Sequence, residues 1–287
     1  MGRRLLCTAA ALLALALTSC SESPGDLTVE GSPPASPYDG PLDLPVKEVP
    51  DEDPDDAYTP IQSLGSAGRA LECDWEVMSG GKGDRWSKSD GGGTPEDGLR
   101  LYFEIYQPGL PTSGYRIERK EKGRVLFSYD VRGRTKVAVI VAKDQPRRPG
   151  WGPDTSAHCD VAELPESFTD DMADDIWHDL DGRRVPTAII TSSEGSGHCD
   201  WQRAHFLELG SGMKRVLYAR DPHTVLPDTM LISRYEKDVE LPADAKDSGY
   251  RLDDWQLWRT DSKSAVYVRT SDAVEKWPAV RKGMACA

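Results

Sequence analysis

The spacing of hydrophobic and polar positions predicts one helix early in the chain. Four large apolar side chains recur at the three- and four-residue intervals of a helix: Leu99, Tyr102, Phe103 and Tyr106. Thr94 and Pro95 precede them and make a favourable helix start, because threonine caps the first turn and proline suits its first position. Pro108-Gly109 then ends the pattern. We therefore expect an amphipathic helix between Thr94 and Pro108.

Shorter hydrophobic runs follow this helix and predict antiparallel strands. The runs lie at residues 115–119, 125–129 and 137–141. Lys122-Gly123 and Arg132-Gly133 separate them as turns, so consecutive strands should pair as a meander. Residues 145–157 contain prolines and Trp151, and they are predicted to form a rigid loop. A helix packed on such strands predicts an α+β unit over residues 61–168.

The second half of the chain has the alternation of strands and little helical periodicity. Its candidate strands are residues 201–209, 215–219, 231–235, 256–260 and 265–269. Asp221-Pro222 and Leu241-Pro242 mark turns, and Asp181-Gly182 marks a tight hairpin before them. These features predict a mainly β unit over residues 185–287. The expected fold class is therefore α+β, with two small, mainly antiparallel β units of which the first carries a packed helix.

Residues 20–60 have a composition unlike the rest of the chain. The whole protein has a formal net charge of −13, and residues 21–60 hold eleven Asp or Glu, one basic residue (Lys47) and nine prolines. Few large apolar groups are available there to offset the entropy of ordering, so we expect a disordered, extended tether. An acidic tail that docks on a basic partner is the alternative. The negative charge argues against nucleic acid as a partner.

The first twenty residues have the layout of an export signal. Arg3-Arg4 precedes an apolar run of 13 residues, Leu5 to Leu17, which is shorter than the roughly 20 residues of a membrane-spanning helix. Thr18-Ser19-Cys20 follows. This arrangement resembles the lipobox of bacterial lipoproteins. The resemblance implies that residues 1–19 are a signal peptide and that Cys20 carries a diacylglyceryl group. It also implies a cell-membrane protein that is lipid-anchored on the extracytoplasmic face.

Four cysteines remain once Cys7 and Cys20 are set aside: Cys73, Cys159, Cys199 and Cys286. An oxidising compartment favours two disulfides among them, and four cysteines allow three pairings. The intervals from Cys73 to Cys159 and from Cys199 to Cys286 are 86 and 87 residues. Nearly equal intervals favour two units that are each closed by their own bridge.

Two short sequences occur twice and support the idea of a duplicated unit. Cys73-Asp74-Trp75 recurs as Cys199-Asp200-Trp201, and residues 113–116 (Ser-Gly-Tyr-Arg) recur as residues 248–251. The segments between them differ in length and pattern, so coincidence remains the alternative.

The second Cys-Asp-Trp sequence is followed by an Arg-Asp-Pro turn at residues 220–222 and by Leu257-Trp258 in a late strand. Together these features resemble lipoproteins of high-GC Gram-positive bacteria. The resemblance covers most of residues 60–287, and it implies no catalytic residues.

Candidate chemistry is sparse along the chain. His158 and His198 adjoin cysteines, but these pairs are forty residues apart, whereas zinc ligands come in closely spaced pairs. Ser211 and Lys214 match the S-x-x-K pattern of penicillin-recognising enzymes without its companion motifs. The aspartates over residues 170–181 lack the spacing of a calcium-binding EF-hand loop. The sequence therefore predicts no catalytic, metal-binding or cofactor-binding residues.

Two of the eight tryptophans are candidates for contact with a partner, Trp151 and Trp258. Core packing is the alternative for both, because indole rings bury large apolar areas. The expected function is that of a non-enzymatic binding or accessory protein that contacts an envelope protein or a glycan. The alternative is a wall-directed hydrolase whose catalytic carboxylates are dispersed along the chain.

Overall fold

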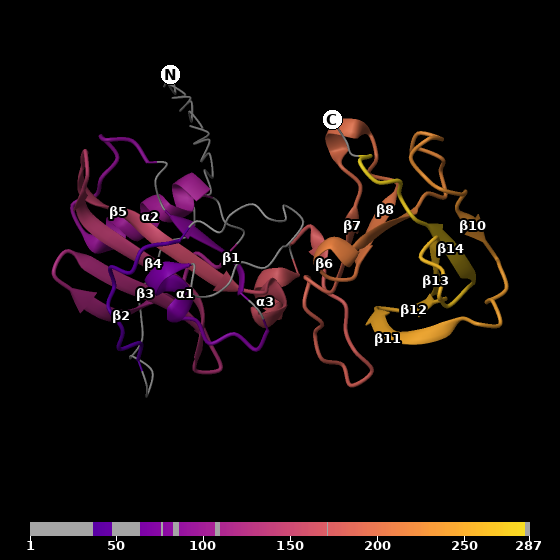
Figure 1. Cartoon of the computed structure of the whole chain (residues 1–287), viewed down its shortest axis with the longest axis horizontal. Helices are drawn as coiled ribbons and strands as arrows, with labels where there is room; N and C mark the ends of the chain where they lie inside the picture. The colour runs from indigo at the N-terminus through magenta and orange to yellow at the C-terminus, as the bar shows by residue number, and fades with distance from the viewer. Residues whose placement is uncertain are drawn as a thin grey trace, which may run out of the picture.

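The computed structural model describes residues 37–47, 64–75, 77–82, 86–106, 110–170 and 172–284. Over these ranges the protein is mostly antiparallel β sheet with few helices. Figure 1 shows two regions, an N-terminal layered unit built on one sheet and a C-terminal sandwich of two sheets. Within the described ranges, none of the helices has both the length and the apolar character needed to span a membrane.

The layered unit is built on a five-stranded sheet with the order β1-β5-β4-β3-β2. Its strands are β1 (Val77–Lys82), β2 (Arg116–Glu121), β3 (Arg124–Val131), β4 (Arg134–Gln145) and β5 (Arg148–Cys159). The predicted helix is α2 (Pro95–Tyr106), and a short helix, α1 (Gly65–Arg69), precedes β1. The expected meander is present as β2, β3 and β4. Its turns lie at Gly123 and Gly133, where φ is +75° and +78°.

The layers follow from the alternation of side chains along β4. Ala138 and Ile140 pack with α1 on one face of the sheet. Val137, Val139 and Val141 pack with α2 on the other face. All five side chains are fully buried. Because both faces of the sheet are covered, β4 has the continuous apolar run of a central strand.

The expected loop over residues 145–157 is instead most of β5, which lies between β1 and β4. The prediction is wrong because a proline without an N–H group can occupy a strand where the pairing is already interrupted. Pro153 pairs with Val141, next to the shift in register between Ile140 and Val141. Trp151 also pairs, through its backbone, with Gly92.

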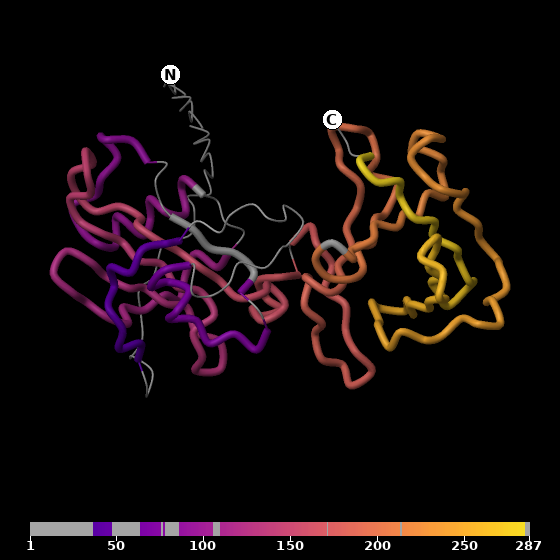
Figure 2. The backbone as a smooth tube through the Cα atoms, in the orientation of Figure 1, coloured from indigo at the N-terminus to yellow at the C-terminus, as the bar shows by residue number. Residues whose placement is uncertain are grey.

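Residues 37–47 correct the tether predicted over residues 20–60. They lie along the layered unit as the indigo tube of Figure 2, and Leu42 is only 1% exposed within the core beside α1. Val46 forms an isolated β-bridge with Leu64. The unit therefore begins before residue 61, because one well-placed leucine orders a segment whose composition indicates disorder. The tether's other residues lie outside the described ranges.

The C-terminal sandwich has two sheets, ordered β6-β7-β8-β9 and β10-β14-β13-β12-β11. The first contains β6 (Asp174–Asp175), β7 (Ile190–Glu194), β8 (His205–Leu209) and β9 (Val216–Arg220). The second contains β10 (Glu236–Lys237), β11 (Lys246–Leu252), β12 (Trp255–Arg259), β13 (Ala265–Arg269) and β14 (Val274–Pro278). Side chains from both sheets share one core, in which Trp177 and Trp277 are fully buried.

Several boundaries in this half differ from those expected. β6 and Trp177 belong to the sandwich, so it begins before residue 185. The strand expected at 231–235 is wrong, because only Leu231 of that range pairs, in an isolated bridge with Val280. β11 was missed because it is an edge strand whose first residues are polar and exposed, so only Tyr250 and Leu252 near its end pack against the core.

The two five-stranded sheets have the same topology. In each, four consecutive strands form a meander and an earlier strand pairs with the last of them. The repeated Ser-Gly-Tyr-Arg sequence leads into β2 in one sheet and lies in β11 in the other, and Gly114 and Gly249 both adopt φ near +80° (81° and 80°). The four-stranded sheet β6–β9 has no counterpart in the layered unit. The structure thus supports duplication of the meander and not of the whole unit.

A buried carboxylate joins the layered unit to the sandwich. Asp160 is 1% exposed and directly follows β5. One of its oxygens accepts hydrogen bonds from the backbone N–H groups of Ala162 (2.9 Å) and Thr187 (3.0 Å), and the other accepts from Ala188 N (3.1 Å). The hydroxyl of Thr187 also donates to this carboxylate at 3.1 Å. Because these donors come from both sides of the junction, Asp160 holds the two regions together.

Replacing Asp160 with alanine should lower the free energy of unfolding by about 3–5 kcal/mol, since several buried donors lose their acceptor. Denaturant titration of the disulfide-intact protein measures this loss. Asp244→Ala is the matched control, because Asp244 is exposed, and its effect should stay within about 0.5 kcal/mol. Equal stabilities of the two variants would contradict the role given to Asp160.

Candidate functional site at the Cys73–Cys159 disulfide

One disulfide ties the start of the sheet to its last meander strand. Cys73 lies shortly before β1, and Cys159 is the final residue of β5, the strand that pairs with β1. The Cα atoms are 5.3 Å apart, and the bond closes a loop of 86 residues. A loop of that length is stabilised by about 4–5 kcal/mol in the chain-entropy account. The bond joins the two cysteines of the first expected pair.

The remaining cysteines are only partly described. Cys199 is disulfide-bonded, and its expected partner, Cys286, lies outside the described residues. Since Cys159 is bonded to Cys73, the alternative pairing of Cys159 with Cys199 is excluded. Cys20, the expected lipidation site, also lies outside the described residues.

A buried ion pair lies beside the Cys73–Cys159 bond. The ammonium group of Lys136, on β4, is 2.5 Å from Glu163 Oε2, and the two side chains are only 3% and 4% exposed. Lys136 Nζ also donates to Asp74 Oδ2 at 3.0 Å and to the carbonyl oxygen of Glu72 at 2.9 Å. All three ammonium hydrogens therefore have acceptors, as a buried charge requires.

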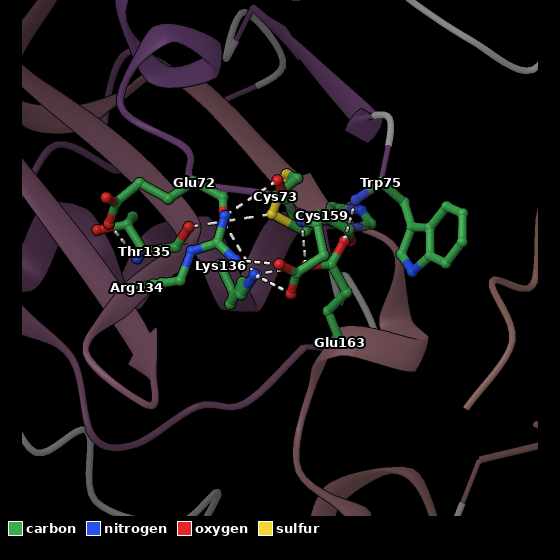
Figure 3. Close-up of a disulfide and its surroundings, with 10 residues drawn as sticks. Glu72, Cys73, Trp75, Arg134, Thr135, Lys136, Cys159 and Glu163 are labelled. Atoms are coloured by element: carbon green, nitrogen blue, oxygen red, sulfur yellow. Dashed lines mark hydrogen bonds and ion pairs between the residues drawn. A yellow bond between two sulfur atoms is a disulfide. The ribbon is translucent and has the colours of Figure 1, made fainter. Parts of the chain in front are cut away.

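Glu163 holds the backbone of the Cys-Asp-Trp sequence in place. It ends the short 3-10 helix η2 (Val161–Glu163), and its two oxygens accept hydrogen bonds from Asp74 N (2.8 Å) and Trp75 N (3.1 Å). The side chain of Trp75 points away from the disulfide in Figure 3 and is 52% exposed. A rigid, charged support thus presents an indole ring to solvent.

Charged groups surround the base of Trp75. Asp74 pairs with Arg134 as well as with Lys136, and Arg134 also donates to the carbonyl oxygen of Cys73 at 3.2 Å. The hydrogen bond from Lys136, helped by one from Arg134, lowers the pKa of Asp74 against the opposing effect of partial burial. Asp74 is therefore ionised at neutral pH, and its side chain remains 54% exposed. Trp75 consequently stands beside an exposed carboxylate and an exposed guanidinium group.

The groups of this cluster are already engaged in hydrogen bonds, ion pairs and the disulfide, which limits the reactions that they could catalyse. A nucleophilic or basic lysine needs a free electron pair, whereas the amino group of Lys136 donates to three acceptors. Potential ligand atoms of Cys73, Cys159 and Glu163 lie within 4.8 Å of one another. Both sulfur atoms are joined to each other, so neither is a thiolate ligand for a metal. What these contacts do is fix the backbone of Asp74 and Trp75.

The structure places the two expected contact residues in other surroundings. Trp151 is half-buried in β5 and packs in the core beside α2. Trp258 is half-buried in β12, with the guanidinium carbon of Arg269 4.9 Å from its ring centroid. The two lie in different regions and neither lies in the disulfide cluster. Packing accounts for the covered part of each ring.

The sequence did not single out Trp75 as an exposed ring, although its motif was visible. The available signal was a tryptophan that directly follows Cys73-Asp74 with no alternating pattern to bury it. The second copy of the motif shows why this signal is weak. Trp201 is half-buried and packs on Phe206, with ring centroids 6.0 Å apart. The same three residues thus leave the ring exposed in one place and half-buried in the other.

Comparisons of the chain with protein-family models, with curated proteins and with solved structures found no match. The resemblance to bacterial lipoproteins accordingly stays a prediction from the sequence.

Replacing Lys136 with methionine should lower the free energy of unfolding by about 3–5 kcal/mol, because it leaves the carboxylate of Glu163 buried without its counter-charge. The double variant Lys136→Met with Glu163→Gln removes both charges and should lose less stability than the single variant. Denaturant titration distinguishes the two cases. A double variant that is less stable than Lys136→Met would contradict the description of this pair.

Proposed function

We propose that this protein is a lipid-anchored, extracytoplasmic binding protein of the cell envelope, and that its partner contacts the surface around Trp75. The observation that carries the proposal is an exposed indole ring whose backbone is fixed by a buried ion pair. A preorganised side chain loses little entropy on binding. Tryptophan is also among the residues that contribute most to interfaces, and its ring stacks well on other apolar faces.

The chemistry around Trp75 suits a partner with both an apolar face and polar groups. The ring offers the apolar contact, while Asp74 and Arg134 offer a hydrogen-bond acceptor and donors next to it. An envelope protein with an apolar side chain at its surface fits this description, and so does a glycan, whose sugar rings have one apolar face and a rim of hydroxyl groups.

The proposed activity is binding without catalysis. Buried carboxylates are the usual candidates for hydrolytic acids and bases. Four buried carboxylates of the described ranges already have strong partners: Asp160 and Asp221 accept from backbone amides, Glu163 holds Lys136, and Glu275 holds Arg220 at 2.6 and 2.9 Å. Glu118, which is also buried, accepts from the backbone N–H group of Tyr38. The hydrolase alternative therefore gains no support from these groups.

The location is tested by replacing Cys20 with alanine. If Cys20 carries the lipid, the wild-type protein should sediment with membranes, and the Cys20→Ala variant should lose at least tenfold of this membrane-bound fraction. Cys7→Ala is the matched control, since Cys7 lies in the expected signal peptide and should leave the fraction unchanged. Equal sedimentation of wild type and Cys20→Ala would overturn the lipid anchor.

The binding surface is tested by crosslinking in intact cells, followed by mass spectrometry of the adducts. Loss of a central tryptophan contact corresponds to about 2 kcal/mol or more, so Trp75→Ala should reduce the adducts by tenfold or more. Leu180→Ala is the matched control, because Leu180 is 71% exposed but lies in the other region. Parallel sedimentation with purified cell-wall glycan separates a glycan from a protein partner. Unchanged adducts and unchanged glycan binding in Trp75→Ala would contradict the proposal.

A further inference from the structure

Residues 37–47, which we call the strap, form part of the core of the layered unit. Leu42 is 1% exposed and packs in the same cluster as Leu64, Leu126 and Ile140. Burying a leucine side chain contributes about 1.5–3 kcal/mol relative to leaving it in water. The burial of Leu42 therefore holds the strap to the unit, and hydrogen bonds add to this contact.

Two carboxylates of β2 accept hydrogen bonds from the backbone of the strap. Glu118 Oε1 accepts from Tyr38 N at 2.7 Å, and Glu121 Oε2 accepts from Leu42 N at 3.3 Å. Glu118 is itself only 8% exposed. Hydrogen bonds to ionised groups are stronger than those between neutral groups. Side chains of the sheet thus accept hydrogen bonds from backbone N–H groups of the strap.

The start of α1 is also shaped to receive the strap. The fully buried hydroxyl of Ser66 donates to the carbonyl oxygen of Pro41 at 2.7 Å and accepts from Leu44 N at 3.0 Å. Gly65 has φ of +64°, and a Cβ atom there would lie 2.6 Å from the carbonyl oxygen of Leu44. Only glycine allows this approach. Residues of α1 and β2 therefore form hydrogen bonds with the backbone of the strap.

We propose that the strap sets how far the layered unit can stand from the membrane, an inference that rests on the proposed lipid at Cys20. Sixteen residues separate Cys20 from Pro37, whereas 43 separate Cys20 from Leu64, where the chain would join the unit if the strap were released. At no more than about 3.6 Å per residue, these lengths limit the attachment to about 60 Å and about 155 Å. The docked strap therefore keeps the unit, and Trp75 with it, close to the lipid surface.

The first step of the test establishes that the strap is released. Leu42→Glu places a charge in the apolar site and should increase the rate of chymotrypsin cleavage after Tyr38 at least tenfold. Asp43→Ala is the matched control, because the side chain of Asp43 follows Leu42 directly and is exposed. This variant should leave the rate unchanged. If Leu42→Glu leaves this rate unchanged as well, the docking of the strap is wrong.

The second step measures reach with the lipidated full-length protein on vesicles that contain an acceptor-labelled lipid. A donor dye at Lys122→Cys, in the exposed β2–β3 turn, reports energy transfer to that lipid. Leu42→Glu should reduce the transfer at least twofold relative to wild type and Asp43→Ala. An insertion of 27 Gly and Ser residues after Glu30 gives the same attachment length with the strap intact, so it should produce the same reduction even if Leu42→Glu does not fold.

The outcomes separate this proposal from the proposed function. A wild-type protein that does not float with the vesicles overturns the lipid anchor, and the reach argument falls with it. A protein that floats but shows equal transfer in wild type and in the insertion variant overturns the strap proposal alone. A second result also overturns the strap proposal. In that result the insertion variant shows reduced transfer, but Leu42→Glu shows unchanged transfer although chymotrypsin now cleaves it rapidly after Tyr38.

Discussion

The arrangement of this protein depends on the carboxylate of Asp160, which follows directly on the disulfide-bonded end of β5. Its bond to Ala162 N begins the short helix η2, and that helix carries Glu163 to the ammonium group of Lys136. Its bonds to Thr187 and Ala188 fix the segment that leads into β7 of the sandwich. A single buried carboxyl group therefore sets both the junction and the support of Trp75. Buried polar groups need hydrogen-bond partners, and the donors to this group come from segments on both sides of the junction.

The same requirement explains why Trp75 is held so firmly. Burying the charges of Lys136 and Glu163 is unfavourable unless their polar atoms are paired. The partners that complete the pairing are backbone groups of residues 72–75 and the carboxylate of Asp74. The backbone beneath the indole ring is thus fixed by the needs of the ion pair. The disulfide adds a covalent limit to movement of the same segment. An exposed ring on so restricted a backbone suits recognition, since most of its freedom is already lost before a partner arrives.

The two five-stranded sheets have the same topology but are covered by different elements. In both regions a five-stranded sheet has the meander flanked by an earlier strand. The layered unit covers its sheet with helices and with residues 37–47, whereas the sandwich covers its sheet with the strands β6–β9. What covers each sheet therefore distinguishes the two regions more than the sheets themselves do. On the proposed lipid anchor, the strap's position also relates the distance of Trp75 from the membrane to the stability of one apolar contact at Leu42.

The sequence by itself determined the elements whose residues repeat at a regular interval. The period of Leu99 to Tyr106 predicted α2, the runs from Tyr115 to Val141 predicted the meander, and the repeated intervals between cysteines favoured the bond that joins Cys73 to Cys159. Only the tertiary structure decided that Pro153 lies in a central strand, that Leu42 is buried and that Trp75 is exposed. The physical reason is distance along the chain. The amide of Trp75 is held by a residue 88 positions away, and no local pattern states which distant segment will cover a side chain or leave it open to solvent.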